Sequence, residues 1–156
     1  MNKQVWIEKA LGLGIQEFEI YQSTTVEKEM TWFQGQMDTL VSSKVTGTSI
    51  RGIVDGKMAN MALEEIDDSM CETILKSLIE QAHIISNEET DSLRKPEPIE
   101  YVKKDVTWNM ASTEYVKNIL QSLEAKILAY DPRVIQVGYL GYSQDSGSRS
   151  IVNSLG

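Results

Sequence analysis

The side chains best suited to chemistry in this 156-residue chain are one histidine and one cysteine, both in the same apolar-patterned segment. His83 follows Glu80 at a spacing that places both side chains on one helix face, as in the metal-binding pairs of di-iron bundles. Such a centre needs a second pair and two further carboxylates from other helices, and none is apparent. Glu80 and His83 are therefore interpreted as ordinary residues of a helix surface.

A cysteine–histidine dyad is excluded if the segment is helical. Twelve residues separate Cys71 from His83, which is about 18 Å at the helical rise of 1.5 Å per residue. Cys71 is interpreted as a small core residue, and a single cysteine forms no internal disulfide. Zinc sites usually draw on several histidines and cysteines, so the chain is expected to hold no metal or other cofactor by itself.

Four acidic residues lie where this helix is expected to begin: Glu64, Glu65, Asp67 and Asp68. Negative charge at the start of a helix complements the helix dipole, which explains the cluster without a metal. A calcium loop would need oxygen ligands at fixed alternating positions, and no glycine-rich phosphate loop is present elsewhere. A structural role is therefore expected.

An arginine lies in the stretch TSIRGIVDGKMANMA, residues 48–62, which otherwise resembles two short strands. The Asp55-Gly56 pair suits a type I′ hairpin turn, because both corner residues must adopt positive φ. This turn sets Arg51 opposite Asn60 on one face of the hairpin. Two interpretations of Arg51 stay open. It pairs with a carboxylate or with carbonyl groups across the sheet, or it anchors a peptide carboxylate or a partner subunit beside Asn60.

The opposite face of the hairpin is expected to lie under a helix. The turn sets Ile50 opposite Met61 and Gly52 opposite Ala59 on that face. The small Gly52–Ala59 pair leaves room for a helix to approach closely.

Periodicity predicts the remaining elements. Apolar residues at helical spacing indicate helices over residues 3–11, 64–85 and 113–130. Ser112 is the expected N-cap of the last helix, whose apolar stripe is Val116, Ile119, Leu120, Leu123, Ile127 and Tyr130. Alternation and turn residues indicate strands over 17–33, 40–47, 48–54, 57–62, 134–142 and 149–153, the last two flanking a turn SQDSGS.

These elements predict an α+β fold, with a largely antiparallel sheet of hairpins and about three helices packed on one face. Residues 87–111 form a long polar connection that holds two of the three prolines. A connection of this length is usually a functional excursion or mobile.

Composition limits the partners. The chain carries 15 basic and 23 acidic residues, a net charge of −8, so nucleic-acid binding is not expected. No uninterrupted apolar run exceeds four residues, far below the ~20 needed to span a bilayer. Glu8 and Lys9 interrupt the apolar stretch that a signal peptide would need. A cytoplasmic protein without membrane contact is expected.

The order of these parts resembles the N-terminal domain of the TldD/PmbA family. The residues that match the family's G-x-x-[IV]-R run, D-G corner and following helix are Gly47, Ile50, Arg51, Asp55, Gly56 and Ala82. The residues that match its N-S-x-G turn are Asn153, Ser154 and Gly156. These residues are expected to be structural. The segment LEEIDD, residues 63–68, and the connection after residue 86 resemble PmbA more than TldD.

The resemblance implies a cytoplasmic peptidase that assembles as a dimer of paralogous or identical subunits and trims unfolded peptides or peptide precursors. TldD-type members carry zinc on an H-E-x-x-x-H helix and a later cysteine, all in a C-terminal domain. Residues 1–156 contain no such helix, so they resemble one N-terminal domain of a longer protein and receive no catalytic residue from the family. The family's older label, modulator of DNA gyrase, gains no support from the acidic charge.

The leading hypothesis is therefore a scaffold and substrate-channel domain of such a peptidase, with no catalysis of its own. Its sheet edge is suited to receive an extended peptide by strand addition. The alternatives are a self-contained peptide- or protein-binding module unrelated to proteolysis, and an independent hydrolase.

Overall fold

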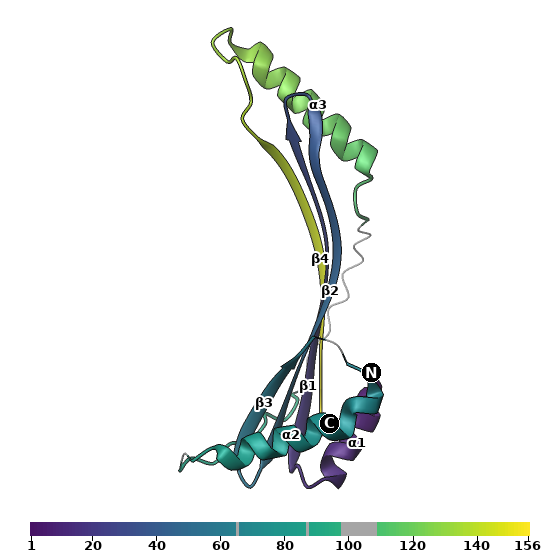
Figure 1. The fold of residues 1–156 in the computed structure, drawn as a ribbon, viewed down its shortest axis with the longest axis vertical. Coiled ribbons are helices and arrows are strands. Elements are labelled where there is room, and N and C mark those ends of the chain that lie inside the picture. The colour runs from purple at the N-terminus through teal and green to yellow at the C-terminus, as the bar shows by residue number, and fades with distance from the viewer. Residues whose placement is uncertain (65, 87, 98–108) are drawn as a thin grey trace. The chain divides into compact units, whose positions relative to one another are not determined.

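The computed structural model describes residues 1–64, 66–86, 88–97 and 109–156, which form an antiparallel four-stranded sheet and three α-helices (Figure 1). The elements are α1 (Lys3–Gly12), β1 (Glu17–Phe33), β2 (Gln36–Val54), β3 (Lys57–Leu63), a 3-10 helix η1 (Asp68–Met70), α2 (Cys71–Ile84), α3 (Thr113–Tyr130) and β4 (Leu140–Asn153). The strand order is β3-β2-β1-β4, so β3 and β4 are the edges. The predicted α+β class is confirmed.

The chain divides into two compact units. The first comprises Met1–Thr24, Thr46–Glu100 and Ser148–Gly156, and the second comprises Thr25–Val45 and Tyr101–Gly147. Strands β1, β2 and β4 contribute residues to both units, and each unit has its own buried apolar cluster.

Helices α1 and α2 cover one face of the strands in the first unit (Figure 1). Gly52 permits this close approach, because an added Cβ would lie 2.9 Å from Ile15 Cγ2 and 3.0 Å from Leu78 Cδ2. Ile50 is fully buried on the same face and Ala59 is 3 % exposed. The prediction that a helix covers this face is confirmed.

The β2–β3 hairpin has the predicted register. Arg51 lies opposite Asn60 and Gly52 opposite Ala59. Asp55 and Gly56 have φ angles of 49° and 73°, the positive values that a type I′ turn requires. A local turn therefore fixes which residues share a face with Arg51.

Helix α2 begins at Cys71, later than the predicted start at residue 64. Asp67 instead caps the 3-10 helix by accepting a hydrogen bond from Ser69 N. Asp68 accepts from Asn2 N and from the indole Nε1 of Trp6. These acids bind the start of α1 and the turn before α2, which is why they do not form the first turn of α2. Residue 65 lies outside the described residues.

The second unit packs α3 against the strands. Ser112 Oγ accepts from Tyr115 N, which confirms the predicted N-cap. Met30 and Trp32 of β1 meet Val116 and Leu120 of α3 in a small buried cluster.

The predicted apolar stripe of α3 is only partly buried. Ile119, Leu123 and Tyr130 are exposed, whereas Glu124 is buried in line with Val116 and Leu120. Only residues spaced four apart on α3 are buried, so the helix contacts the strands along a narrower stripe than predicted.

Two long strands replace predicted pairs of shorter ones. Strand β2 continues through Gly47, where an added Cβ would make only an ordinary 3.8 Å contact with Ser23 Oγ. Strand β4 runs through SQDSGS, which was predicted as a turn, and residues 134–139 lie outside any strand. These small and polar residues favour a turn by local preference, but strand preferences depend on context and the pairing of β4 with β1 overrides them here.

Candidate functional site: the Arg51 pocket

Arg51 pairs with a carboxylate on the neighbouring strand. Its Nε donates to Glu19 Oε1 of β1 at 2.7 Å. Glu19 lies between Phe18 and Ile20, which are fully buried, and its own side chain is only 9 % exposed. The Arg51 side chain is 43 % exposed, so it covers Glu19 while part of it still faces solvent.

This ion pair forms part of a pocket of about 660 Å³ within the first unit. Three segments line it: the central strands, a described part of the long connection, and the end of β4 with the turn that follows. The lining residues are Glu19, Arg51, Arg94, Lys95, Pro96, Glu97, Ile151, Val152, Asn153 and Gly156.

Residues 88–97, one of the two described parts of the connection, are held against the hairpin. Asp91 N donates to Gly56 O at 2.9 Å, and Asp91 Oδ2 accepts from Met58 N at 3.1 Å. Leu93 is only 5 % exposed. These contacts position Arg94 and its neighbours beside the central strands.

The pocket is locally basic in an acidic chain. Three basic side chains and two acidic ones line it, so its net charge is 3 − 2 = +1. Two ion pairs, Arg51 with Glu19 and Arg94 with Glu97, engage both acids. Among the described residues, Lys95 and the two terminal nitrogens of Arg51 have no recorded polar partner. The site therefore offers two cationic groups to a ligand with negative charge.

The turn after β4 fastens the first strand. Ser154 N donates to Phe18 O at 2.8 Å, and Phe18 N donates to Ser154 Oγ at 2.9 Å. Asn153 Oδ1 accepts from Leu155 N at 2.9 Å, which shapes the turn, and Gly156 has a φ of +118°. The N-S-x-G residues thus hold the end of β4 beside the pocket.

The remaining predicted positions lie elsewhere. Gly47 lies inside β2, and Asn60 is exposed opposite Arg51 but does not line the pocket. Asp55 is at the hairpin tip, where its Oδ2 is 3.6 Å from Nε2 of the exposed His83. Cys71 is fully buried, and burial raises the pKa of its thiol.

The structure thus brings together Arg51, Asn153 and Gly156 of the predicted residues and adds three that sequence reasoning missed, Glu19, Arg94 and Lys95. The sequence contained one signal for Glu19. This residue alternates along its strand with apolar neighbours, which indicates that its side chain lies on the opposite face of the strand from theirs. Among the residues that the structure describes, no three histidine, cysteine or acidic side chains are grouped to hold a metal ion. None of the described helices is long and apolar enough to cross a membrane.

Comparison with known proteins defines the class. Residues 18–86 match the sequence model of PmbA/TldA metallopeptidase domain 1. These residues include the central hairpin, Arg51 and α2. The resemblance to the N-terminal domain of the TldD/PmbA family is therefore confirmed over these residues. No curated protein matches the sequence.

The solved structures that share the fold include the following three. TldE from Thermococcus kodakarensis superposes with a TM-score of 0.82 at 18 % identity, over 99 % of this chain. A candidate modulator of a DNA gyrase from Thermotoga maritima superposes with a TM-score of 0.77 at 18 % identity, also over 99 % of this chain. A candidate modulator of DNA gyrase from Bacteroides thetaiotaomicron superposes with a TM-score of 0.64 at 20 % identity, over 95 % of this chain. This chain spans 35 % of the length of each. The PmbA-like preference stays a prediction.

Proposed function

We propose that this chain is the N-terminal scaffold and substrate-channel domain of a cytoplasmic TldD/PmbA-type metallopeptidase subunit that processes unfolded peptides or peptide precursors. Cleavage is assigned to another part of the protein, where the family resemblance implies zinc in a C-terminal domain. The proposed partner is a paralogous or identical subunit. The match of residues 18–86 to the first domain of proteins described as metallopeptidases supports the reaction class.

The observation that carries the proposal is the Arg51 pocket. Glu19 occupies Nε of Arg51, which leaves the two terminal nitrogens of the guanidinium as a fork that fits a carboxylate. Lys95 adds a second positive charge at the same pocket. Ile151 and Val152 supply an apolar wall. Together these groups suit a peptide that ends in a free carboxylate.

An exposed strand edge supplies the second half of the interaction. Strand β4 is an edge of the sheet, and its residues 151–153 line the Arg51 pocket. An extended peptide that added to this edge would use backbone hydrogen bonds, which ask little of its side chains. Such a site would accept many unfolded sequences, as a general peptide-processing protein requires.

The division of labour is tested by comparing residues 1–156 alone with the whole protein. We expect the shorter chain, shown to be folded by circular dichroism, to bind no stoichiometric zinc and to cleave no peptide. Zinc binding and cleavage by the shorter chain would contradict the proposal. Peptide binding without any cleavage by the whole protein would instead favour a self-contained binding module.

Kinetics test the role of the pocket. In the whole protein, Arg51→Met should raise KM for a peptide by about tenfold with kcat unchanged, because the lost contact serves binding only. The matched control is Arg133→Met, which removes another arginine that is paired with an aspartate but lies in the second unit. Equal KM values for both variants would contradict a peptide-binding role for Arg51.

A further inference from the structure

Glu124 is a buried carboxylate without a cationic partner among the described residues. It lies on α3 and is only 8 % exposed. Its Oε2 accepts from the indole Nε1 of Trp32 at 2.7 Å, and its Oε1 accepts from Gly35 N at 3.2 Å. Both donors are neutral, and no ion pair found in the described part of the chain includes Glu124. A carboxylate has about four acceptor positions, so this one retains capacity for further donors.

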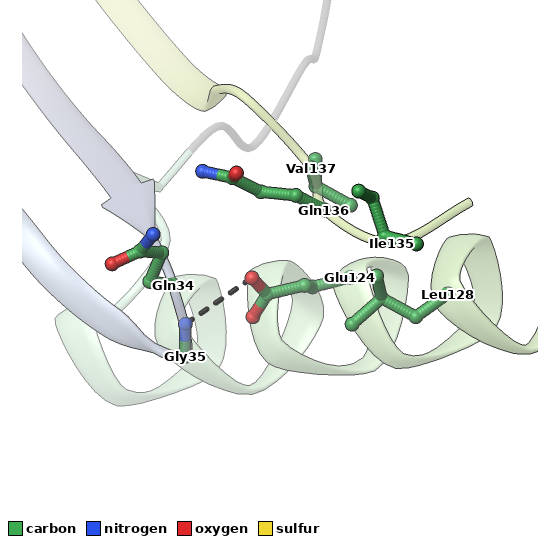
Figure 2. Close-up of a pocket in the computed structure, with 7 residues that line it drawn as sticks. All are labelled: Gln34, Gly35, Glu124, Leu128, Ile135, Gln136 and Val137. Carbon is green, nitrogen blue, oxygen red and sulfur yellow. Dashed lines mark hydrogen bonds between the residues drawn. The ribbon is translucent and has the colours of Figure 1, made fainter. Parts of the chain in front are cut away.

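The carboxylate opens onto a pocket of about 390 Å³ within the second unit (Figure 2). Figure 2 shows Glu124 extending from the helix, with Gln34 at the β1–β2 turn and residues 135–137 across the pocket. Gln34 and Gln136 each bring a carboxamide, whose oxygen is a further acceptor. Leu128, Ile135 and Val137 provide apolar walls.

We propose that this pocket binds a lysine or arginine side chain presented by a polypeptide partner. The negative charge of Glu124 is shielded from water on most sides, and a hydrogen-bonded cation compensates such a charge well. The apolar walls suit the methylene stem of a basic side chain, and the carboxamide oxygens suit its remaining N–H groups.

Exposed apolar residues favour a polypeptide over a free cation. Ile135 is 90 % exposed and Leu128 is 39 % exposed, and both line the pocket beside the carboxylate. A small ammonium ion would leave these side chains in water, whereas a polypeptide segment would cover them. The inferred partner is therefore a basic side chain with apolar neighbours.

The test uses the whole protein labelled with 5-fluorotryptophan, because the Trp32 indole donates a hydrogen bond to Glu124, the carboxylate proposed to bind the basic side chain. The probe is acetyl-Leu-Lys-Leu-amide, and the control probe replaces lysine by norleucine. We expect the lysine probe to shift the Trp32 fluorine signal saturably, with at least about tenfold tighter binding than the norleucine probe. The signal is assigned with Trp32→Phe.

Two variants locate the site. Glu124→Gln removes the charge and keeps one carbonyl oxygen, which can still accept from the Trp32 indole, while the weaker bond from Gly35 N is lost. It should weaken lysine-probe binding at least about tenfold. Glu114→Gln, on the exposed first turn of the same helix, should not change binding. If Glu124→Gln fails to fold, the lysine and norleucine probes still decide the question in the unaltered protein.

Three results would overturn the inference: no saturable shift, equal affinity for both probes, or unchanged affinity in folded Glu124→Gln. Butylamine binding as tightly as the lysine probe would overturn the choice of a polypeptide. The outcome is independent of the Arg51 pocket, because both probes end in an amide and lack the carboxylate proposed to bind there.

Discussion

Arg51 shields a carboxylate that is almost fully removed from solvent. The pair is one of two that engage the acidic groups of the pocket, and it joins β1 to β2. Arg51 therefore contributes to the stability of the sheet, whether or not it also binds a ligand. A loss of peptide affinity in an Arg51 variant is therefore meaningful only when the stability of that variant is measured as well.

Arg51→Met should lower the free energy of unfolding by about 1–3 kcal/mol, because it leaves Glu19 buried without its charged donor. Urea unfolding measures this change. The double variant Arg51→Met with Glu19→Leu should recover part of the loss, because no unpaired charge remains buried. A double variant less stable than Arg51→Met alone would show that the pairing is not the cause.

Asp68 gives a pH-dependent prediction. The indole N–H of Trp6 and then the backbone N–H of Asn2 lower its pKa from the ordinary value of 3.8. A lowered folded-state pKa stabilises the protein above the ordinary value, and this contribution disappears as pH falls through the folded-state pKa. Asp68→Asn should therefore lower the free energy of unfolding at about pH 7. The difference in unfolding free energy between this variant and the unaltered protein should shrink below about pH 4.

Urea midpoints across this pH range measure the Asp68 effect. Asp145→Asn is the control, because Asp145 is exposed on β4 and has no polar contact recorded among the described residues. The urea midpoint of Asp145→Asn should equal that of the unaltered protein at every pH. A deficit in Asp68→Asn that stays constant down to about pH 3 would contradict the assignment of the pKa shift.

At the scale of elements, the contact between α2 and the sheet depends on one absent side chain. Gly52→Ala would place Cβ 2.9 Å from Ile15 Cγ2 and 3.0 Å from Leu78 Cδ2. We expect a loss of about 1–3 kcal/mol in the free energy of unfolding, because a packed core must shift to accept the methyl group. Thermal or urea unfolding measures it.

Gly12→Ala is the matched control for Gly52→Ala. Gly12 ends α1 in the same unit, and an added Cβ there meets nothing within 4 Å. Alanine in a helix is favoured over glycine, so this variant should be unchanged or slightly more stable. Equal destabilisation of both variants would contradict the close-packing explanation.

Local signals predicted the elements that local interactions determine. The Asp55-Gly56 turn and the Ser112 cap were readable because a few neighbouring residues determine each. The continuity of β2 and β4 was not readable, because a strand is stabilised by a partner that is distant in sequence. Likewise, Asp68 looked like a helix-dipole residue until its bond to Trp6, 62 residues away, was known.

The same distinction explains the candidate site. Arg51 was identified because the hairpin register follows from its turn. Glu19 is 32 residues away and Lys95 belongs to the long connection, so neither could be placed beside Arg51 without the fold. Glu124 was missed because a glutamate in a helical pattern ordinarily indicates an exposed position.

At the scale of the whole molecule, this chain corresponds to about a third of the solved structures that share its fold. Residues 18–86 match the first domain of proteins described as metallopeptidases. In the proposed arrangement, these residues hold and direct a peptide whose cleavage occurs elsewhere in the protein. The Arg51 pocket would then set which end of the peptide is recognised.

The most direct test of this account measures the affinity of the whole protein for one peptide with either a free C-terminal carboxylate or a C-terminal amide. The unaltered protein should bind the free acid at least about tenfold more tightly, and Arg51→Met should bind both forms equally. Equal affinity of the unaltered protein for the two forms, or a preference for the acid that persists in Arg51→Met, would contradict it.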